Sequence, residues 1–76
     1  MNSSLVKEEE VTRNLYEKYG AIIAAVEVWK ILGYRTIHGY RKARLRKSLP
    51  IREFEIPGRR GKYVLTRDVE RWLDSL

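Results

Sequence analysis

The chain has 76 residues, too few for two separate hydrophobic cores, and its 43% hydrophobic and 34% charged residues are typical of one folded domain. It has no cysteine and a single histidine, which excludes a disulfide framework and a thiolate metal site, and no cofactor is expected. The net charge of +6 is uneven: residues 1–27 carry a net −2 and residues 35–62 a net +8, which favours a polyanionic partner such as nucleic acid.

The first half of the chain predicts two helices before the basic region. Apolar residues share one side of a helical wheel over 5–19, and Gly20 follows at the position favoured for a C-terminal cap. A second, well-buried helix is expected over 24–32 because apolar residues cover most of its wheel. Gly33 ends this helix and opens a short connection.

A third helix is expected over 37–47, with Thr36 as its N-cap. Tyr40 and Ala43 fall on the side that faces the core. Gly39 weakens a helix by about 1 kcal/mol relative to alanine, which predicts close packing there against the preceding helix or against DNA. The opposite face gathers Arg35, His38, Arg41, Lys42 and Leu45.

The region after this helix predicts a β-hairpin wing over 51–65. Pro50 ends the helix, and apolar residues in 51–56 and 63–65 indicate two short strands. The turn over 57–62 contains glycines and three cations, Arg59, Arg60 and Lys62.

A closing helix is expected over 66–76. Thr66 is its predicted N-cap, and Asp68 lies near the positive end of the helix dipole. An apolar stripe follows at helical spacing, comprising Val69, Trp72, Leu73 and Leu76. Two short helices over 24–47 joined by a turn containing glycine are the outline of a helix-turn-helix, so the expected class is mainly α with a small β-hairpin, an α+β winged helix-turn-helix.

Several short motifs over residues 19–74 resemble the MerR-like winged-helix DNA-binding proteins of the AlpA, excisionase and pyocin-activator-like group. The motifs are Tyr19-Gly20, Ile31-Leu32-Gly33, Leu49-Pro50, Asp68-Val69 and Trp72-Leu73. The resemblance implies a recognition helix over 36–47 and a wing tip over 57–62. With the N-terminal helix that the wheel predicts, taken as 1–19, the expected organisation is one winged helix-turn-helix domain over 1–76. The chain departs from the family pattern at Gly39 and at Lys47-Ser48, which replaces the usual glycine before Leu-Pro.

These features predict sequence-specific binding to double-stranded DNA, without catalysis. Arginine can donate two hydrogen bonds to guanine, and an apolar side chain can contact a thymine methyl group in the major groove. The expected recognition-helix contacts are Arg35, His38, Arg41, Lys42, Leu45 and Arg46. The expected wing contacts, to phosphate or minor groove, are Arg59, Arg60 and Lys62. His38 has no nucleophile or carboxylate in a pattern that catalysis would need, and no metal ligand set is expected.

The resemblance implies a transcriptional regulator or an excisionase-like recombination directionality factor of a phage or mobile element, with an integrase or RNA polymerase as protein partner. Small domains of this kind are expected to bind DNA cooperatively with further copies of themselves. We expect a cytoplasmic, nucleoid-associated protein, since no apolar stretch of about 18 residues occurs. Two alternatives stay open from the residues: a protein interaction module with a basic docking surface, and an RNA-binding domain. A charged face kept only for solubility is a further, less favoured explanation of the basic block.

Overall fold

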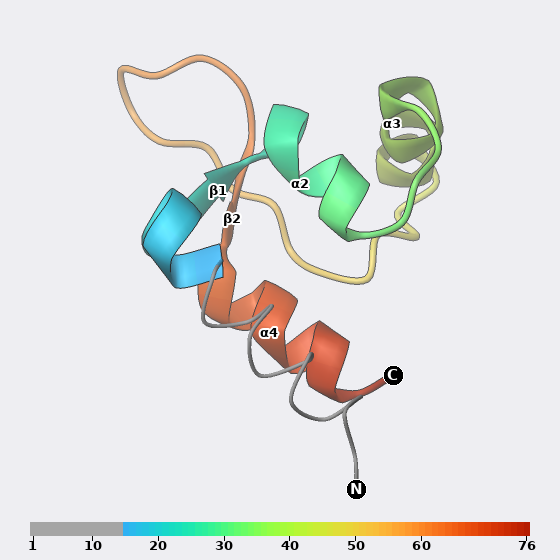
Figure 1. The fold of residues 1–76 in the computed structure, drawn as a ribbon. Coiled ribbons are helices and arrows are strands. Elements are labelled where there is room, and N and C mark those ends of the chain that lie inside the picture. The colour runs from blue at the N-terminus through green and yellow to red at the C-terminus, as the bar shows by residue number, and fades with distance from the viewer. Residues whose placement is uncertain (1–14) are drawn as a thin grey trace, which may run out of the picture.

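The computed structural model describes residues 15–76, which form a mixed α+β fold around a two-stranded antiparallel sheet (Figure 1). The first described residues, 15–19, are helical, and the part of the predicted N-terminal helix before them lies outside the described residues. The elements that follow are β1 (Ile22–Ala24), α2 (Ala25–Ile31), α3 (Ile37–Leu45), β2 (Tyr63–Leu65) and α4 (Thr66–Asp74). Between residues 15 and 76, no helix is long and apolar enough to cross a membrane.

The sheet brings together two segments that are far apart in the sequence. Ile23 of β1 pairs with Val64 of β2, and both side chains are fully buried. The hydroxyl of Thr66 donates a 2.6 Å hydrogen bond to the carbonyl oxygen of Gly20, next to this pairing. The prediction that Thr66 is the N-cap of the last helix is therefore wrong: Thr66 is the first residue of α4, its hydroxyl joins the two chain segments, and Leu65 occupies the cap position.

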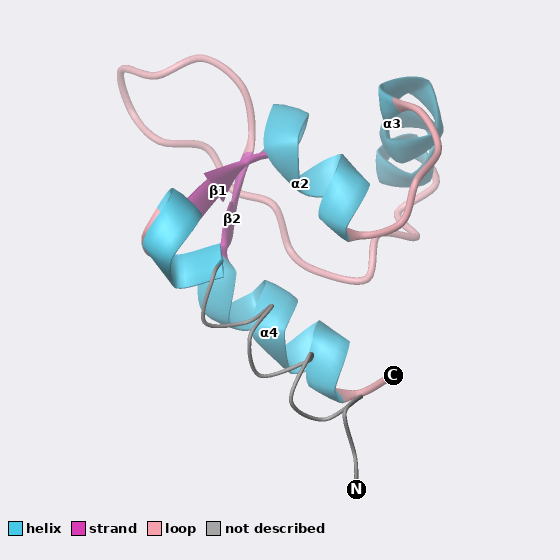
Figure 2. Ribbon diagram, viewed as in Figure 1, coloured by secondary structure: helices cyan, strands magenta, loops and turns pink. Residues whose placement is uncertain are grey.

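The predicted wing hairpin over 51–65 is present only in part. The strand expected over 63–65 is confirmed, but its partner is β1, which the sequence patterns did not indicate. The segment 51–56 is a loop that meets the sheet at a single bridge, between Phe54 and Tyr63 (Figure 2). The segment does not form a regular strand because the carboxylate of Glu53 is bonded to Arg44 of α3. That bond directs Glu53 toward α3 and away from the sheet.

The core confirms the predicted inner faces of the helices. Tyr40 is fully buried and Ala43 nearly so, as the wheel over this helix predicts. Trp29 and Trp72 pack against the core while staying partly exposed. Leu76 contradicts its predicted place in the closing stripe, since it is 80% exposed beyond the end of α4. The buried apolar residues are Leu15, Ile23, Ala25, Val28, Leu32, Tyr40, Ala43, Val64 and Val69.

Both ends of α3 are closed by local hydrogen bonds. Thr36 is the N-cap, as predicted, and its hydroxyl oxygen accepts from the amide of Gly39 at 3.1 Å. The helix ends at Leu45, two residues before the predicted end, because Lys47 adopts a left-handed backbone with φ 56°. The amide of Ser48 then donates to the carbonyl oxygen of Ala43 at 2.9 Å, which is the Schellman arrangement that usually carries glycine at the position of Lys47.

Gly39 is not packed tightly against α2, contrary to one of the two reasons predicted for it. A methyl group added to Gly39 would lie 3.6 Å from the hydroxyl oxygen of Thr36 and 3.9 Å from the ring of Tyr34, both ordinary contacts. The protein interior therefore leaves room for alanine at this position. Close packing against the preceding helix is therefore wrong, and close approach to DNA stays a prediction.

Candidate nucleic-acid interface

The outer face of α3 carries hydrogen-bond donors whose side chains make no hydrogen bond or ion pair within residues 15–76. His38, Arg41 and Lys42 lie within the helix and are exposed, while Tyr40 and Ala43 hold its opposite face in the core. The other predicted residues of this group lie at the ends of the helix or just beyond it and are exposed too: Arg35, Leu45 and Arg46. Leu45 is 82% exposed.

The loop over 55–62 carries the second group of predicted cations. Arg59 and Arg60 are exposed, while Lys62 is half-buried and its Nζ lies 3.3 Å from Oε2 of Glu55. The loop makes three hydrogen bonds: the hydroxyl of Tyr63 donates to the carbonyl oxygen of Arg60 at 3.1 Å, the amide of Ala25 donates to that of Lys62 at 2.9 Å, and a turn joins Arg59 to residue 56. The predicted basic turn is therefore present, although the strand leading into it is absent.

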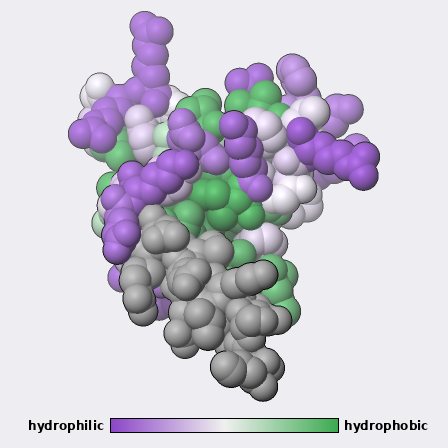
Figure 3. All heavy atoms as spheres, in the orientation of Figure 1, coloured by the Kyte–Doolittle hydropathy of each residue, from purple (hydrophilic) through white to green (hydrophobic). Residues whose placement is uncertain are grey.

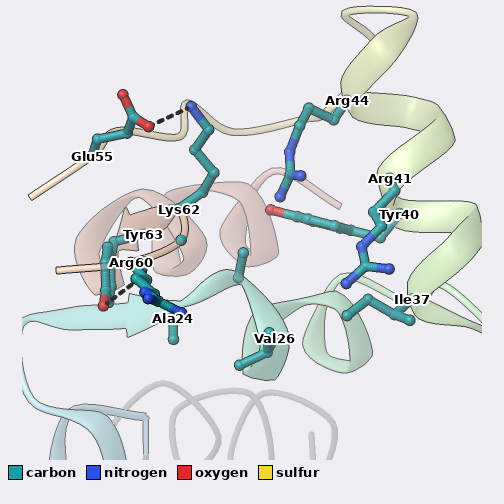
Figure 4. Close-up of a pocket in the computed structure, with 12 residues that line it drawn as sticks. Ala24, Val26, Ile37, Tyr40, Arg41, Arg44, Glu55, Arg60, Lys62 and Tyr63 are labelled. Carbon is teal, nitrogen blue, oxygen red and sulfur yellow. Dashed lines mark hydrogen bonds and ion pairs between the residues drawn. The ribbon is translucent and has the colours of Figure 1, made fainter.

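Cations from the helix and from the loop surround one open hollow of about 350 Å³. Arg41 and Arg44 of α3 line one side and Arg60 and Lys62 line the other, with the start of α2 between them (Figure 4). Figure 3 shows the same division from a greater distance: hydrophilic side chains stand out over α3 and over the loop, with apolar surface between them. Of the predicted site residues, Arg41, Arg60 and Lys62 meet at this hollow and the other six lie outside it.

Sequence reasoning missed the most highly connected polar group beside this hollow, which joins Tyr40, Arg44 and Glu53. The guanidinium of Arg44 donates to both carboxylate oxygens of Glu53, from Nε to Oε1 at 2.7 Å and from Nη2 to Oε2 at 2.8 Å. The hydroxyl of Tyr40 donates to the same Oε2 at 2.6 Å, and the Arg44 guanidinium lies 5.4 Å from the Tyr40 ring centre. No periodic signal links residues nine apart across a proline, so this group was not visible in the sequence.

The electrostatics of the group agree with its geometry. Burial alone would raise the pKa of Glu53, but the hydrogen bonds from Arg44 and Tyr40 outweigh it and hold the pKa below its ordinary value. Burial, and then the hydrogen bond to Glu53, raise the pKa of Tyr40 well above its ordinary value, so the phenol stays protonated. The hydrogen bond to Glu53 raises the pKa of Arg44 further. At neutral pH the group is thus an ionised carboxylate held between a guanidinium and a phenol.

This arrangement provides concentrated positive charge and directed N–H donors, which suit an anionic ligand. Within residues 15–76, no three histidine, aspartate or glutamate side chains come close enough to hold a metal ion. The acidic side chains that do face the cations, Glu53 and Glu55, are each paired with one of them. The cations and N–H donors at this surface suit the recognition of negative charge.

Comparisons with known proteins give no relative for this chain. It matches no protein-family model, no curated protein and no solved structure.

Proposed function

We propose that this protein binds double-stranded DNA in a sequence-specific manner, with α3 as the reading helix and the 55–62 loop as a second contact. The observation that carries the proposal is the outer face of α3, where exposed cationic and polar side chains stand opposite the buried Tyr40 and Ala43. A helix held by its inner face can present that outer face to a groove without rearrangement.

The dimensions of α3 suit the major groove. An α-helix with its side chains is about 10–12 Å in diameter, and the major groove of B-DNA is about 12 Å wide. Arg41, near the middle of the exposed face, is the residue proposed to hydrogen-bond a base edge. Leu45, exposed at the end of the helix, is proposed to contact a thymine methyl group.

The loop is proposed to contact phosphates rather than base edges. Its cations, Arg59, Arg60 and Lys62, lie on a segment with few internal hydrogen bonds, and phosphate contacts tolerate small shifts in position better than base contacts do. Binding by both elements would neutralise about five to seven phosphates, so the affinity for DNA should depend strongly on salt concentration.

The biological role proposed from the family resemblance is transcriptional control or the direction of site-specific recombination in a mobile element. Winged-helix proteins of both kinds use one architecture, so the residues do not separate the two roles. A single domain of this size covers few base pairs, and we propose that several copies bind neighbouring half-sites cooperatively.

The salt dependence of binding tests this function. Affinity for duplex DNA, duplex RNA, single strands and an acidic protein would be measured by fluorescence anisotropy between 50 and 300 mM salt, roughly the range in which counterion release is resolved. Duplex DNA should bind best, with a slope of log affinity against log salt of roughly −4 to −6. A slope near zero on duplex DNA would exclude the proposed function. Preference for duplex RNA or for the acidic protein would favour the corresponding alternative.

A further inference from the structure

Arg44 lies at the hollow with part of its hydrogen-bonding capacity unused. An arginine side chain has five N–H donors, and the two bonds to Glu53 occupy one on Nε and one on Nη2. The side chain of Arg44 is 32% exposed, whereas that of Glu53 is only 9% exposed. The pair therefore presents the donors of the guanidinium to the outside and keeps the carboxylate covered.

The orientation of this guanidinium is set from two sides. Glu53 holds it by two parallel hydrogen bonds, and the ring of Tyr40 lies 5.4 Å from it. Tyr40 itself is fully buried and donates to Glu53. A side chain held in this manner loses little conformational freedom when it binds a ligand, which favours a bidentate contact with a phosphate.

Further cations complete the surroundings of Arg44. Figure 4 shows its guanidinium directed into the space between α3 and the loop that carries Lys62, with Arg41 on the near side and the backbone of residues 24–26 below. The Nζ atom of Lys62 forms an ion pair with Oε2 of Glu55 at 3.3 Å. The side chain of Glu55 is 73% exposed, and an ion pair in water is weak. An incoming anion can therefore replace Glu55 at little cost.

We propose that this hollow is a seat for one backbone phosphate of the bound DNA, with Arg44 as its anchor and Glu53 as the residue that positions Arg44. The proposal deepens the proposed function and depends on it. A strand that passes from the groove occupied by α3 to the loop crosses the space between them, and its phosphate would meet Arg44 and Lys62 there.

Substitution of Arg44 tests the seat, with Arg67 as a matched control because it is exposed on α4 and does not line the hollow. Arg44→Gln should lower the affinity for target and random duplex DNA alike, by about tenfold, and make the salt slope shallower by about one unit. Arg67→Gln should change neither quantity. Glu53→Gln removes the carboxylate that positions Arg44, so the affinity should fall. It keeps the charge of Arg44, so the salt slope should stay the same.

Thermal melts establish that each variant is folded at the temperature of the binding assay. If the Arg44–Glu53 pair has a purely structural role, Arg44→Gln should have a lower melting temperature but, while folded, the same DNA affinity and salt slope as the parent. That result would overturn the phosphate seat and leave the proposed function standing.

A second measurement uses the parent protein and inorganic phosphate, so it holds even if a variant does not fold. The NMR signal of Arg44 Nε–H should shift on addition of phosphate and not with chloride at equal ionic strength. A shift without any binding of duplex DNA would support the anion seat and reject the proposed function. An unmoved signal together with tight, salt-dependent DNA binding would reject the seat alone.

Discussion

Helix α3 and the 55–62 loop carry similar positive charge, but the structure anchors them very differently. The helix is capped at Thr36, closed at its other end through Ser48, and held by the buried Tyr40 and by the bonds of Arg44 to Glu53. The loop is held by one bridge to the sheet, one turn, an exposed ion pair, and two hydrogen bonds to its backbone carbonyls, from the Tyr63 hydroxyl to Arg60 and from the Ala25 amide to Lys62. Since base readout requires fixed geometry and phosphate contact does not, anchoring rather than charge distinguishes the two proposed roles.

Removal of the Tyr40 ring, which anchors α3 in the core, should have the largest effect on stability. Tyr40→Ala should lower the free energy of unfolding by about 3–5 kcal/mol, because it deletes a fully buried ring and leaves Glu53 without one of its donors. Tyr16→Ala, at a tyrosine that is 44% exposed, should cost less than about 1 kcal/mol. Urea unfolding of both variants would measure the difference, and equal losses would show that α3 is not anchored as described.

Substitutions on the two elements compare reading with gripping directly. Arg41→Ala should cost about 1–3 kcal/mol on the target site and relax the preference at one base pair, with a smaller loss on random DNA. Arg60→Ala should weaken target and random DNA equally and reduce the salt slope by about one unit. Competition binding with a library of site variants would measure both. If only Arg60→Ala alters base preference, the two roles are reversed.

Acid should weaken the bonds by which Glu53 holds α3. Since the pKa of Glu53 is lowered in the folded protein from its ordinary 4.5, its stabilising contribution is present above that pH and is lost as the pH falls through the lower folded value. Glu53→Gln should cost about 1.5 kcal/mol at neutral pH. Its difference from the parent protein should shrink below about pH 4. Denaturant unfolding from pH 3 to 7 checks this, and a difference that does not vary with pH would contradict the ion pair.

The smallest expected effect concerns the end of α3. Lys47→Gly should stabilise the protein by about 1 kcal/mol, because glycine adopts the left-handed backbone of this position without steric cost. Lys42→Gly, at a helical position, should instead destabilise by about 1 kcal/mol. Differential scanning calorimetry of both proteins would show opposite shifts of the melting temperature, and a decrease for both would indicate that the lysine side chain stabilises this turn.

Much of the fold was predictable because it depends on local patterns. The inner face of α3, its Thr36 cap and the strand at 63–65 follow from residues close in sequence, and all three are confirmed. The sequence predicted each cation proposed for the interface except Arg44. Its partner is Glu53, and no helical or strand periodicity links these two residues. Thr66 was misassigned for a similar reason, since its hydroxyl bonds to Gly20, 46 residues away.

By itself, the sequence determined where the helices form, which faces are buried and where the positive charge concentrates, because periodicity and capping act over a few residues. Only the tertiary structure decided that β2 pairs with β1 and that segment 51–56 serves as a brace for α3. The physical reason is that both segments 22–24 and 51–56 offer backbone groups and apolar side chains to β2. Ile23 fits opposite Val64 in the dry core, while Glu53 gains more from the donors of Arg44 and Tyr40 than from a place in the sheet.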